Sequence, residues 1–233
     1  MEHAATMEDS IHLSRYAQEL VEIARFQAPP MRDEYRSMAL LGLAMAYGLD
    51  GRYADALHAA KETLWTANHL PDGTSHNFIE ARSLLVMAEI YGHSDPQKAL
   101  DTLLLADVPA SLLFASGEEP RIGIETACAI AEAHEGLEGS AAALPSWQKC
   151  HKRVSSVSIS DETAAIEFVA SLGICRGQQE IGELGLALVA ARRSLDESIQ
   201  ISEGTLGTPS RPFARLRMAE PEGTAVARER RPI

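Results

Sequence analysis

The group of side chains that most resembles a reactive site lies past the middle of this 233-residue chain, where His134 and Glu135 are followed by Glu138. A histidine beside carboxylates can act as a general base or bind a metal ion. The patterns that usually complete such a site, HExxH, GxSxG, GxxxxGK[ST] and GxGxxG, are all missing from the sequence. We therefore assign no catalytic, cofactor-binding or metal-binding residue, and we predict that the chain is not an enzyme.

Three cysteines, Cys128, Cys150 and Cys175, form no CxxC pair, and their odd number leaves one unpaired in any disulfide scheme. We expect reduced thiols, with Cys128 and Cys175 serving as small apolar fillers inside helices. The N-terminal segment MEHAATMEDS lacks the basic and then apolar run of a signal peptide. Both observations predict a cytoplasmic or nuclear protein in a reducing compartment.

Tryptophans and glycines can also mark functional sites. Trp65 and Trp147 belong to residue types found at binding hot spots, but we expect both to fill the core between helices. Gly182 and Gly185 lack the flanking strand of a phosphate-binding loop. A close contact between helices or the start of a helix explains this glycine pair better.

Composition favours helices and an acidic surface. Hydrophobic residues make up 45% of the chain but aromatic residues only 5%, with alanine and leucine dominant, which predicts an all-α fold. Residues 1–210 carry 15 Lys and Arg against 30 Asp and Glu, whereas the segment from Arg211 carries six Arg against three Glu. An acidic body argues against nucleic acid as a ligand. It also argues against an anionic membrane, and the longest apolar stretch, Met38 to Tyr47, is too short to span a bilayer.

A helix–turn–helix unit recurs along the chain. In SMALLGLAMAYGLDGRYADALHAAKETL, which begins at Ser37, apolar residues keep helical spacing on both sides of a turn at Gly51. One position of this unit returns after 44, 43 and 42 residues, as Tyr47, Tyr91, His134 and Arg176. His134 thus takes the place of a tyrosine, which favours a packing role over catalysis.

Small residues recur with the same period. Two helices can approach closely only where the facing side chains are small, so we expect these positions to be buried at helix contacts. In the first helices they are Ala44, Ala88, Ala131 and Gly173, and in the second helices they are Ala56, Ala99 and Ala143.

The first unit resembles the tetratricopeptide-repeat (TPR) consensus, through Ala44, Tyr47, Gly51, Tyr53 and the Ala56-Leu57 pair. The resemblance implies a right-handed α-solenoid of antiparallel helix hairpins, with about four repeats at residues 37–70, 80–116, 121–155 and 162–203. The units are longer than the usual 34 residues. Similar long repeats occur in kinesin light chains, in subunits of large assemblies and in ligand-sensing arms of bacterial regulators.

Two segments flank the repeats expected within 31–203. Residues 1–30 contain EDSIHLSRYAQELVEIARF, which predicts an amphipathic helix that packs on or caps the solenoid, with Asp9 or Ser10 as its cap. Its predicted apolar side consists of Ile11, Leu13, Tyr16, Leu20, Ile23 and Ala24. Residues 204–233 are rich in Gly, Pro and charge, and we expect a disordered basic tail. Its RERR cluster is compatible with an import or docking signal and with an ordinary solvated terminus.

The resemblance also implies a binding surface, since the first helix of each TPR hairpin lines a concave groove. That row changes from apolar to acidic along the chain, so we expect a protein or peptide partner with both apolar and basic residues. An alternative is that the apolar end of the row is buried against the N-terminal helix. The predicted groove residues are Met38, Leu41, Met45, Arg82, Leu85, Glu89, His93, Glu125, Glu132, Glu135, Glu167 and Gln178.

These features predict a non-enzymatic scaffold, an adaptor or a structural subunit of a larger assembly. The alternative is a regulatory module that senses a ligand or a peptide by closing around it. Neither function requires a cofactor.

Overall fold

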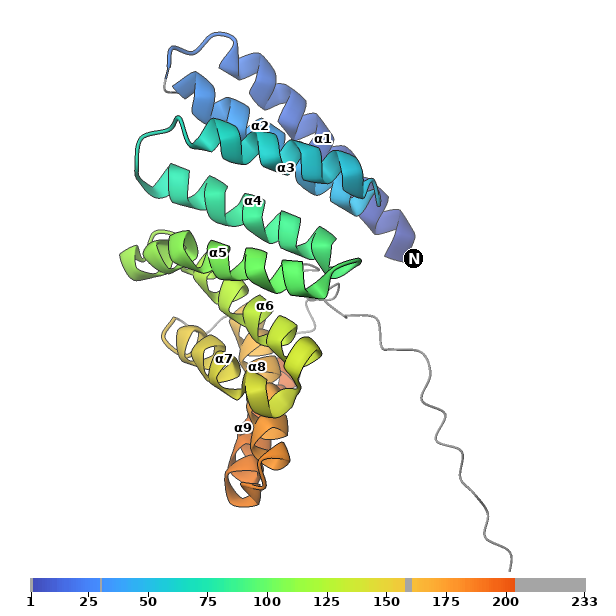
Figure 1. Ribbon diagram of the computed structural model, residues 1–233, viewed down its shortest axis with the longest axis vertical. Helices are drawn as coiled ribbons and strands as arrows, with labels where there is room; N and C mark the ends of the chain where they lie inside the picture. Colours follow the sequence, from blue (N-terminus) through green and yellow to red (C-terminus); the bar gives the residue numbers. More distant parts are fainter. Residues whose placement is uncertain (1, 30, 158–160, 204–233) are drawn as a thin grey trace, which may run out of the picture.

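The computed structural model describes residues 2–29, 31–157 and 161–203, and within these ranges the chain forms nine helices and no strand. The helices follow one another along the long axis of the molecule, which confirms the all-α, TPR-like solenoid (Figure 1). Their bounds are α1 Glu2–Ala24, α2 Met31–Leu49, α3 Tyr53–Ala67, α4 Thr74–Gly92, α5 Pro96–Ser116, α6 Pro120–Glu138, α7 Ser140–Val154, α8 Asp161–Glu180 and α9 Leu184–Glu203.

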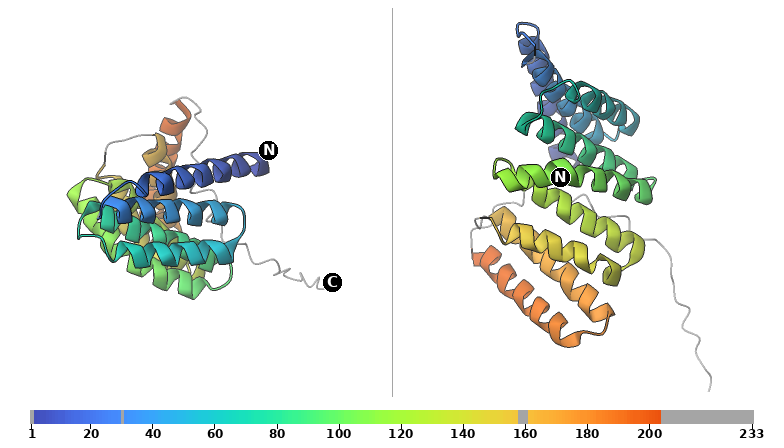
Figure 2. Two further views of the ribbon diagram at one scale, coloured as in Figure 1. Left: turned by 90° about the horizontal axis from the view of Figure 1, so that it is seen from above. Right: turned by 60° about the vertical axis from the view of Figure 1, so that its left-hand side comes forward.

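The helices pair into four hairpins, α2–α3, α4–α5, α6–α7 and α8–α9, and each hairpin packs on the next (Figure 2). The first helices of successive hairpins also contact each other, α2 with α4 and α4 with α6. Among the described residues, the backbones of α3 and α5, and those of α5 and α7, do not come as close to each other. The first helices therefore lie on the inner side of the solenoid, and the second helices lie on the outer side.

Turn chemistry sets the ends of the hairpin helices. Gly51 has a φ of 73°, a left-handed conformation that costs glycine little, and it separates α2 from α3 as the sequence predicted. In the next hairpin, the Asp95 carboxylate accepts a hydrogen bond of 3.1 Å from the Lys98 backbone N–H, with Pro96 in the first turn of α5. The expected repeat of helix, tight turn and helix thus has a local cause in these two hairpins.

The periodic small residues lie in the core. Ala44, Ala88 and Ala131 are buried on the first helices, and Ala56, Ala99 and Ala143 are buried on the second. Gly173 on α8 meets Trp147 of the preceding hairpin, and a Cβ atom added at Gly173 would lie 2.3 Å from Trp147 Cδ2. This position requires glycine because an aromatic ring occupies the space beside it.

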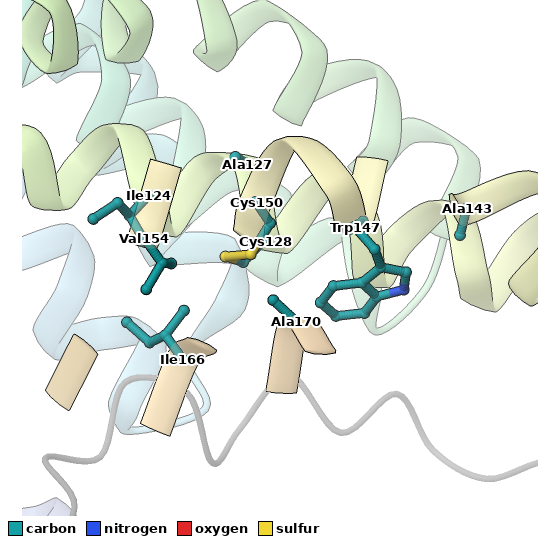
Figure 3. Packing of buried hydrophobic residues seen from close by; sticks show 10 residues of the cluster. Ile124, Ala127, Cys128, Ala143, Trp147, Cys150, Val154, Ile166 and Ala170 are labelled. Carbon is teal, nitrogen blue, oxygen red and sulfur yellow. A yellow bond between two sulfur atoms is a disulfide. The ribbon is translucent and has the colours of Figure 1, made fainter. Parts of the chain in front are cut away.

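Trp147 is the largest fully buried side chain, and it lies in a cluster built from α6, α7 and α8 (Figure 3). Ile124, Val154 and Ile166 pack in the same cluster. Its role in the core confirms the prediction for this tryptophan. The same prediction is wrong for Trp65, which is 64% exposed on α3.

Cys128 of α6 and Cys150 of α7 form a disulfide within this cluster, with their Cα atoms 4.9 Å apart (Figure 3). The expectation of three reduced thiols is therefore wrong for this pair. The two cysteines are 22 residues apart, and only the hairpin brings them together. Cys175 remains a free thiol on α8. The disulfide removes one of the two observations behind the intracellular location, which stays a prediction.

Helix α1 differs from the prediction in its start and in part of its buried face. It begins at Glu2, so Asp9 and Ser10 lie inside the helix and cannot cap it. Leu20 and Ala24 of the predicted apolar side are buried, and Leu20 packs with Ala17 against α2, whereas Ile11, Tyr16 and Ile23 are exposed. Ala17 allows α1 to approach α2 closely, and Ile11 and Ile23 are left on the outer side.

A polar network joins α5, α6 and α7. The Arg153 guanidinium donates to Asp107 Oδ1 at 3.2 Å, to the Gly123 carbonyl at 2.6 Å and to Ser111 Oγ at 2.5 Å. Lys149 Nζ donates to Asp107 Oδ2 at 2.5 Å. Burial acts to raise the pKa of Asp107, but Lys149 and Arg153 outweigh it and hold that pKa below its usual value. The Asp107 carboxylate joins α5 to α7, and the Arg153 guanidinium extends the network to α6, so that it clamps three successive helices.

Pro30, predicted for the first turn of a helix, and the basic tail at 204–233 lie outside the described residues.

Candidate functional site

The inner surface, formed by α2, α4, α6 and α8, is connected by side-chain contacts between equivalent parts of successive repeats. Ser75 donates to Glu34 at 2.6 Å, and Arg82 donates to Glu125 at 2.5 Å. Arg176 donates to Glu135 through two hydrogen bonds of 2.7 Å. The paired residues are 41 or 43 positions apart, close to one repeat length. These contacts hold the inner helices in register.

Glu125 is used by the fold itself. It is 6% exposed, and its carboxylate accepts from Arg82 of α4 and, at 2.7 Å, from Arg121 one turn earlier on α6. A buried carboxylate with two guanidinium partners contributes little net negative charge to the surface. The acidity predicted for this part of the groove is thus largely neutralised at Glu125.

Glu135 has a similar structural role. Besides Arg176, it accepts hydrogen bonds from Ser140 at 2.6 Å and from Trp147 Nε1 at 3.0 Å. Burial acts to raise the pKa of Glu135, but the hydrogen bonds from Arg176 and Ser140 outweigh it and hold that pKa below its usual value. The neighbouring His134 contacts Ser146 Oγ at 2.7 Å, a packing contact between α6 and α7. The suggestive His134-Glu135 pair therefore serves helix packing.

Glu132 behaves differently. Its Oε2 atom is shielded from solvent and finds no hydrogen-bond partner among the described residues, and the same holds for Gln178 Oε1 on α8. Burial, aided by the negative charge of Glu135, raises the pKa of Glu132 to about 7 against the opposing effect of Arg176. A buried acceptor without a donor is costly to a folded protein, and such groups are often functional.

Glu132→Gln is expected to stabilise the protein at alkaline pH. A carboxyl whose pKa is raised by folding favours the folded state when protonated, so its ionisation destabilises the fold as the pH rises from about 4.5 to about 7. At pH 8 the variant should gain on the order of 2 kcal/mol in unfolding free energy, and near pH 4.5 the gain should fall below about 0.5 kcal/mol. Urea unfolding followed by far-UV circular dichroism measures both.

Glu138→Gln, at the exposed end of the same helix, is the matched control and should change stability little at either pH. A gain for Glu132→Gln that does not depend on pH would contradict the raised pKa.

A hollow of about 350 Å³ opens between α1, α2 and α4; we call it the N-terminal hollow. Met38 lies in its wall and also packs against Ala17 and Leu20 of α1, while Leu41 is fully inside the core. Helix α1 thus covers part of the apolar end of the row and leaves the hollow open. The hollow is lined by Tyr16, Leu20, Met31, Glu34, Tyr35, Met38, Thr74, Ser75, Phe78 and Glu119.

The structure disperses the other predicted groove residues. Leu85 packs into the core between α4, α5 and α6, and Met45 is half-buried on α2. His93 stacks on the Tyr53 ring at 4.8 Å beside a turn, and Glu89 is exposed. Glu167 accepts from Ser155 at 2.6 Å, at the end of α7. The spacing of residues along the first helices therefore did not distinguish positions that face the core from positions that face the groove.

A second apolar surface, which the sequence analysis did not identify, lies on the outer side. Leu105, Val108 and Leu112 of α5 are exposed and border a hollow of about 400 Å³ with Leu64 of α3. Helix α5 is also long and apolar enough to cross a membrane by length and composition alone. It packs between α4 and α6, so its apolar residues divide between the core and this outer surface.

Comparison with known proteins supports the fold. No protein-family model and no curated protein matches the sequence. Two crystal structures of a Podosopora anserina protein assigned as a kinesin light chain, with nearly identical TPR-like repeats, are similar with a TM-score of 0.55 at 15% and 16% identity. They cover 87% and 88% of this chain and 99% and 100% of their own. BtubC (BKLC) from P. vanneervenii gives 0.48 at 14% identity, covering 89% of this chain and 96% of that one.

The helix order, the inner surface and the similarity to the two Podosopora anserina structures define a TPR-like α-solenoid. Proteins with this architecture generally bind other proteins, and the fold alone does not choose a partner. Among the described residues, no three His, Cys, Asp or Glu side chains are placed to hold a metal ion.

Proposed function

We propose that this chain is a non-enzymatic protein-interaction scaffold whose inner surface binds an extended or helical segment of a partner protein. The observation that carries the proposal is the N-terminal hollow, which opens on the inner surface with aromatic, methionine and carboxylate side chains in its walls. A concave apolar site with a few polar groups is the usual form of a binding site. Its position beside α2 and α4 lets a bound segment continue along the inner helices.

Glu132 lies further along the inner helices, on α6, and gives the proposal a second observation. Its Oε2 atom lacks a hydrogen-bond donor among the described residues and is shielded from solvent, so a donor supplied by a partner reaches it only after a local rearrangement of the inner helices. The body of the chain is acidic, so it attracts basic segments over a distance. Apolar burial in the hollow then provides affinity, and the carboxylates provide orientation.

A peptide-display selection on the immobilised full chain tests this function. We expect enrichment of segments that combine apolar residues with Lys or Arg, and binding of the selected peptides can be measured by fluorescence anisotropy. Met31→Arg, in the wall of the hollow, should weaken binding by about tenfold or more.

Leu105→Arg is the matched control, because it places the same charge on an exposed apolar position of the outer surface. It should leave the affinity within about twofold. Loss of binding in Leu105→Arg alone would place the partner on the outer side, and a selection that enriches no peptide would reject the scaffold. Tight binding of a small metabolite in the hollow would favour a sensing module instead.

A further inference from the structure

The lining of the N-terminal hollow combines three kinds of side chain. Tyr16, Tyr35 and Phe78 contribute aromatic rings from α1, α2 and α4, and Met31 and Met38 contribute flexible apolar surface. Glu34 and Glu119 contribute carboxylates, and none of the lining residues is cationic. The hollow is therefore electronegative through both its rings and its acids.

The two carboxylates differ in the hydrogen bonds that they already accept from the protein. Glu34 accepts one hydrogen bond from Ser75, which leaves acceptor capacity on the carboxylate. The Glu119 carboxylate is exposed and makes no hydrogen bond or ion pair within the described part of the chain. Thr74, also in the wall, is bound to the neighbouring Glu118. The hollow thus offers two carboxylates that can accept further hydrogen bonds, Glu34 beside its bond from Ser75 and Glu119 with none from the described residues.

We propose that the N-terminal hollow receives an arginine side chain of the bound partner segment. The aliphatic stem lies against the methionines and Leu20, and the planar guanidinium stacks on the aromatic rings and donates to Glu34 and Glu119. A lysine fits less well because its strongly hydrated ammonium has no face to stack and no fork to donate from. This inference rests on the proposed scaffold function and adds the identity of the anchoring residue.

Methionine-methyl NMR on the full chain tests the proposal directly. With ¹³C-labelled methionine methyl groups, Met31 and Met38 report on the hollow, while Met45 and Met87 report on other parts of the inner helices. The probes are N-acetyl-arginine-N-methylamide and its neutral isostere N-acetyl-citrulline-N-methylamide. We expect saturable shifts of Met31 and Met38 with the arginine probe, at least about tenfold weaker binding of the citrulline probe, and no change at Met45 or Met87.

Variants separate specific recognition from general attraction. Glu34→Gln with Glu119→Gln should weaken the arginine probe by about tenfold, and Tyr16→Ala should weaken it by several fold. Glu62→Gln, an exposed acid on α3, is the control and should have no effect.

Equal shifts with the citrulline probe, or shifts spread over all methionines, would overturn the proposal. Far tighter binding of free arginine or agmatine than of the capped probe would also overturn it, since it would assign the hollow to a small metabolite. If display selection yields inner-surface peptides that lack arginine, the arginine inference fails and the scaffold function stands.

Discussion

Replacing Trp147 with alanine is expected to lower the free energy of unfolding by about 3–5 kcal/mol. The indole is 1% exposed and fills the junction of α6, α7 and α8, so its removal loses buried apolar area and leaves a cavity. It also removes the hydrogen bond from Nε1 to Glu135. Urea unfolding followed by far-UV circular dichroism measures the loss, which does not depend on tryptophan fluorescence.

Trp65→Ala is the matched control, because Trp65 is 64% exposed on α3. This substitution should lower the free energy of unfolding by about 0.5 kcal/mol, within a factor of two, as surface substitutions usually do. Similar losses for both tryptophans would contradict the assignment of Trp147 to the core.

Gly173→Ala tests the packing of Trp147 against α8 a second time, because the sign of its effect on stability depends on whether the ring is present. In the native protein the new Cβ would lie 2.3 Å from Trp147 Cδ2, so the variant should lose about 1–3 kcal/mol through overpacking. In a Trp147→Ala background the ring is gone, and the higher helix propensity of alanine should make the same substitution stabilising by up to about 1 kcal/mol. Additive effects of the two substitutions would refute direct contact.

Asp107→Ala is expected to cost about 3–4 kcal/mol at neutral pH. It leaves the Arg153 guanidinium, whose side chain is 11% exposed, without its carboxylate partner between α5, α6 and α7. Because folding lowers the pKa of Asp107, its contribution to stability is complete above the ordinary value of 3.8 and is lost as the pH falls through the lower folded value. The difference between the variant and the native protein should therefore shrink in strong acid, as measured by thermal unfolding at several pH values.

Asp101→Ala, on the same helix, is the control for this network. Asp101 makes only an exposed hydrogen bond, from Gln97, among its contacts with described residues. Its removal should change stability by about 0.5 kcal/mol or less. A cost for Asp107→Ala as small as this would show that the network does not clamp the three helices.

The repeat was readable from the sequence because packing constraints recur with it. Ala44, Ala88 and Ala131 are small wherever two helices approach, and Gly51 supplies a left-handed turn that few other residues adopt. Such constraints act between residues near in sequence, so a pattern of about 43 residues was enough to predict hairpins. The observed solenoid and the similar TPR-like structures confirm that level of the prediction.

The sequence pattern did not predict the side-chain contacts between neighbouring helices and repeats. Glu125 looked like a groove residue by spacing, yet its carboxylate is buried under Arg82, and helical periodicity cannot show which partner the neighbouring helix offers. The Cys128–Cys150 disulfide depends on how α6 faces α7, not on any cysteine motif. Trp65 was wrongly placed in the core because helical periodicity does not show which face of α3 the neighbouring helices cover.

The N-terminal hollow was foreseen only in part. Met38 was predicted to line a groove, but two of the three aromatic side chains beside it, Tyr16 and Phe78, come from α1 and α4, whose packing against α2 the sequence does not show. Glu34 lies in the first turn of α2, and Glu119 directly precedes α6. Acidic residues at helix N-termini usually interact favourably with the helix dipole, so these two did not suggest a binding site. The site became visible once three helices were placed around it.

Hydrogen–deuterium exchange with and without a display-selected peptide tests most directly whether the inner surface is the binding site. On binding, we predict slower exchange in the first helices, strongest in α2 and α4 around the N-terminal hollow and extending into α6 near Glu132. The outer helices α3, α5 and α7 should exchange at unchanged rates. Protection confined to α5 and the neighbouring face of α3, with α2 and α4 unaffected, would contradict the account and assign binding to the outer hollow.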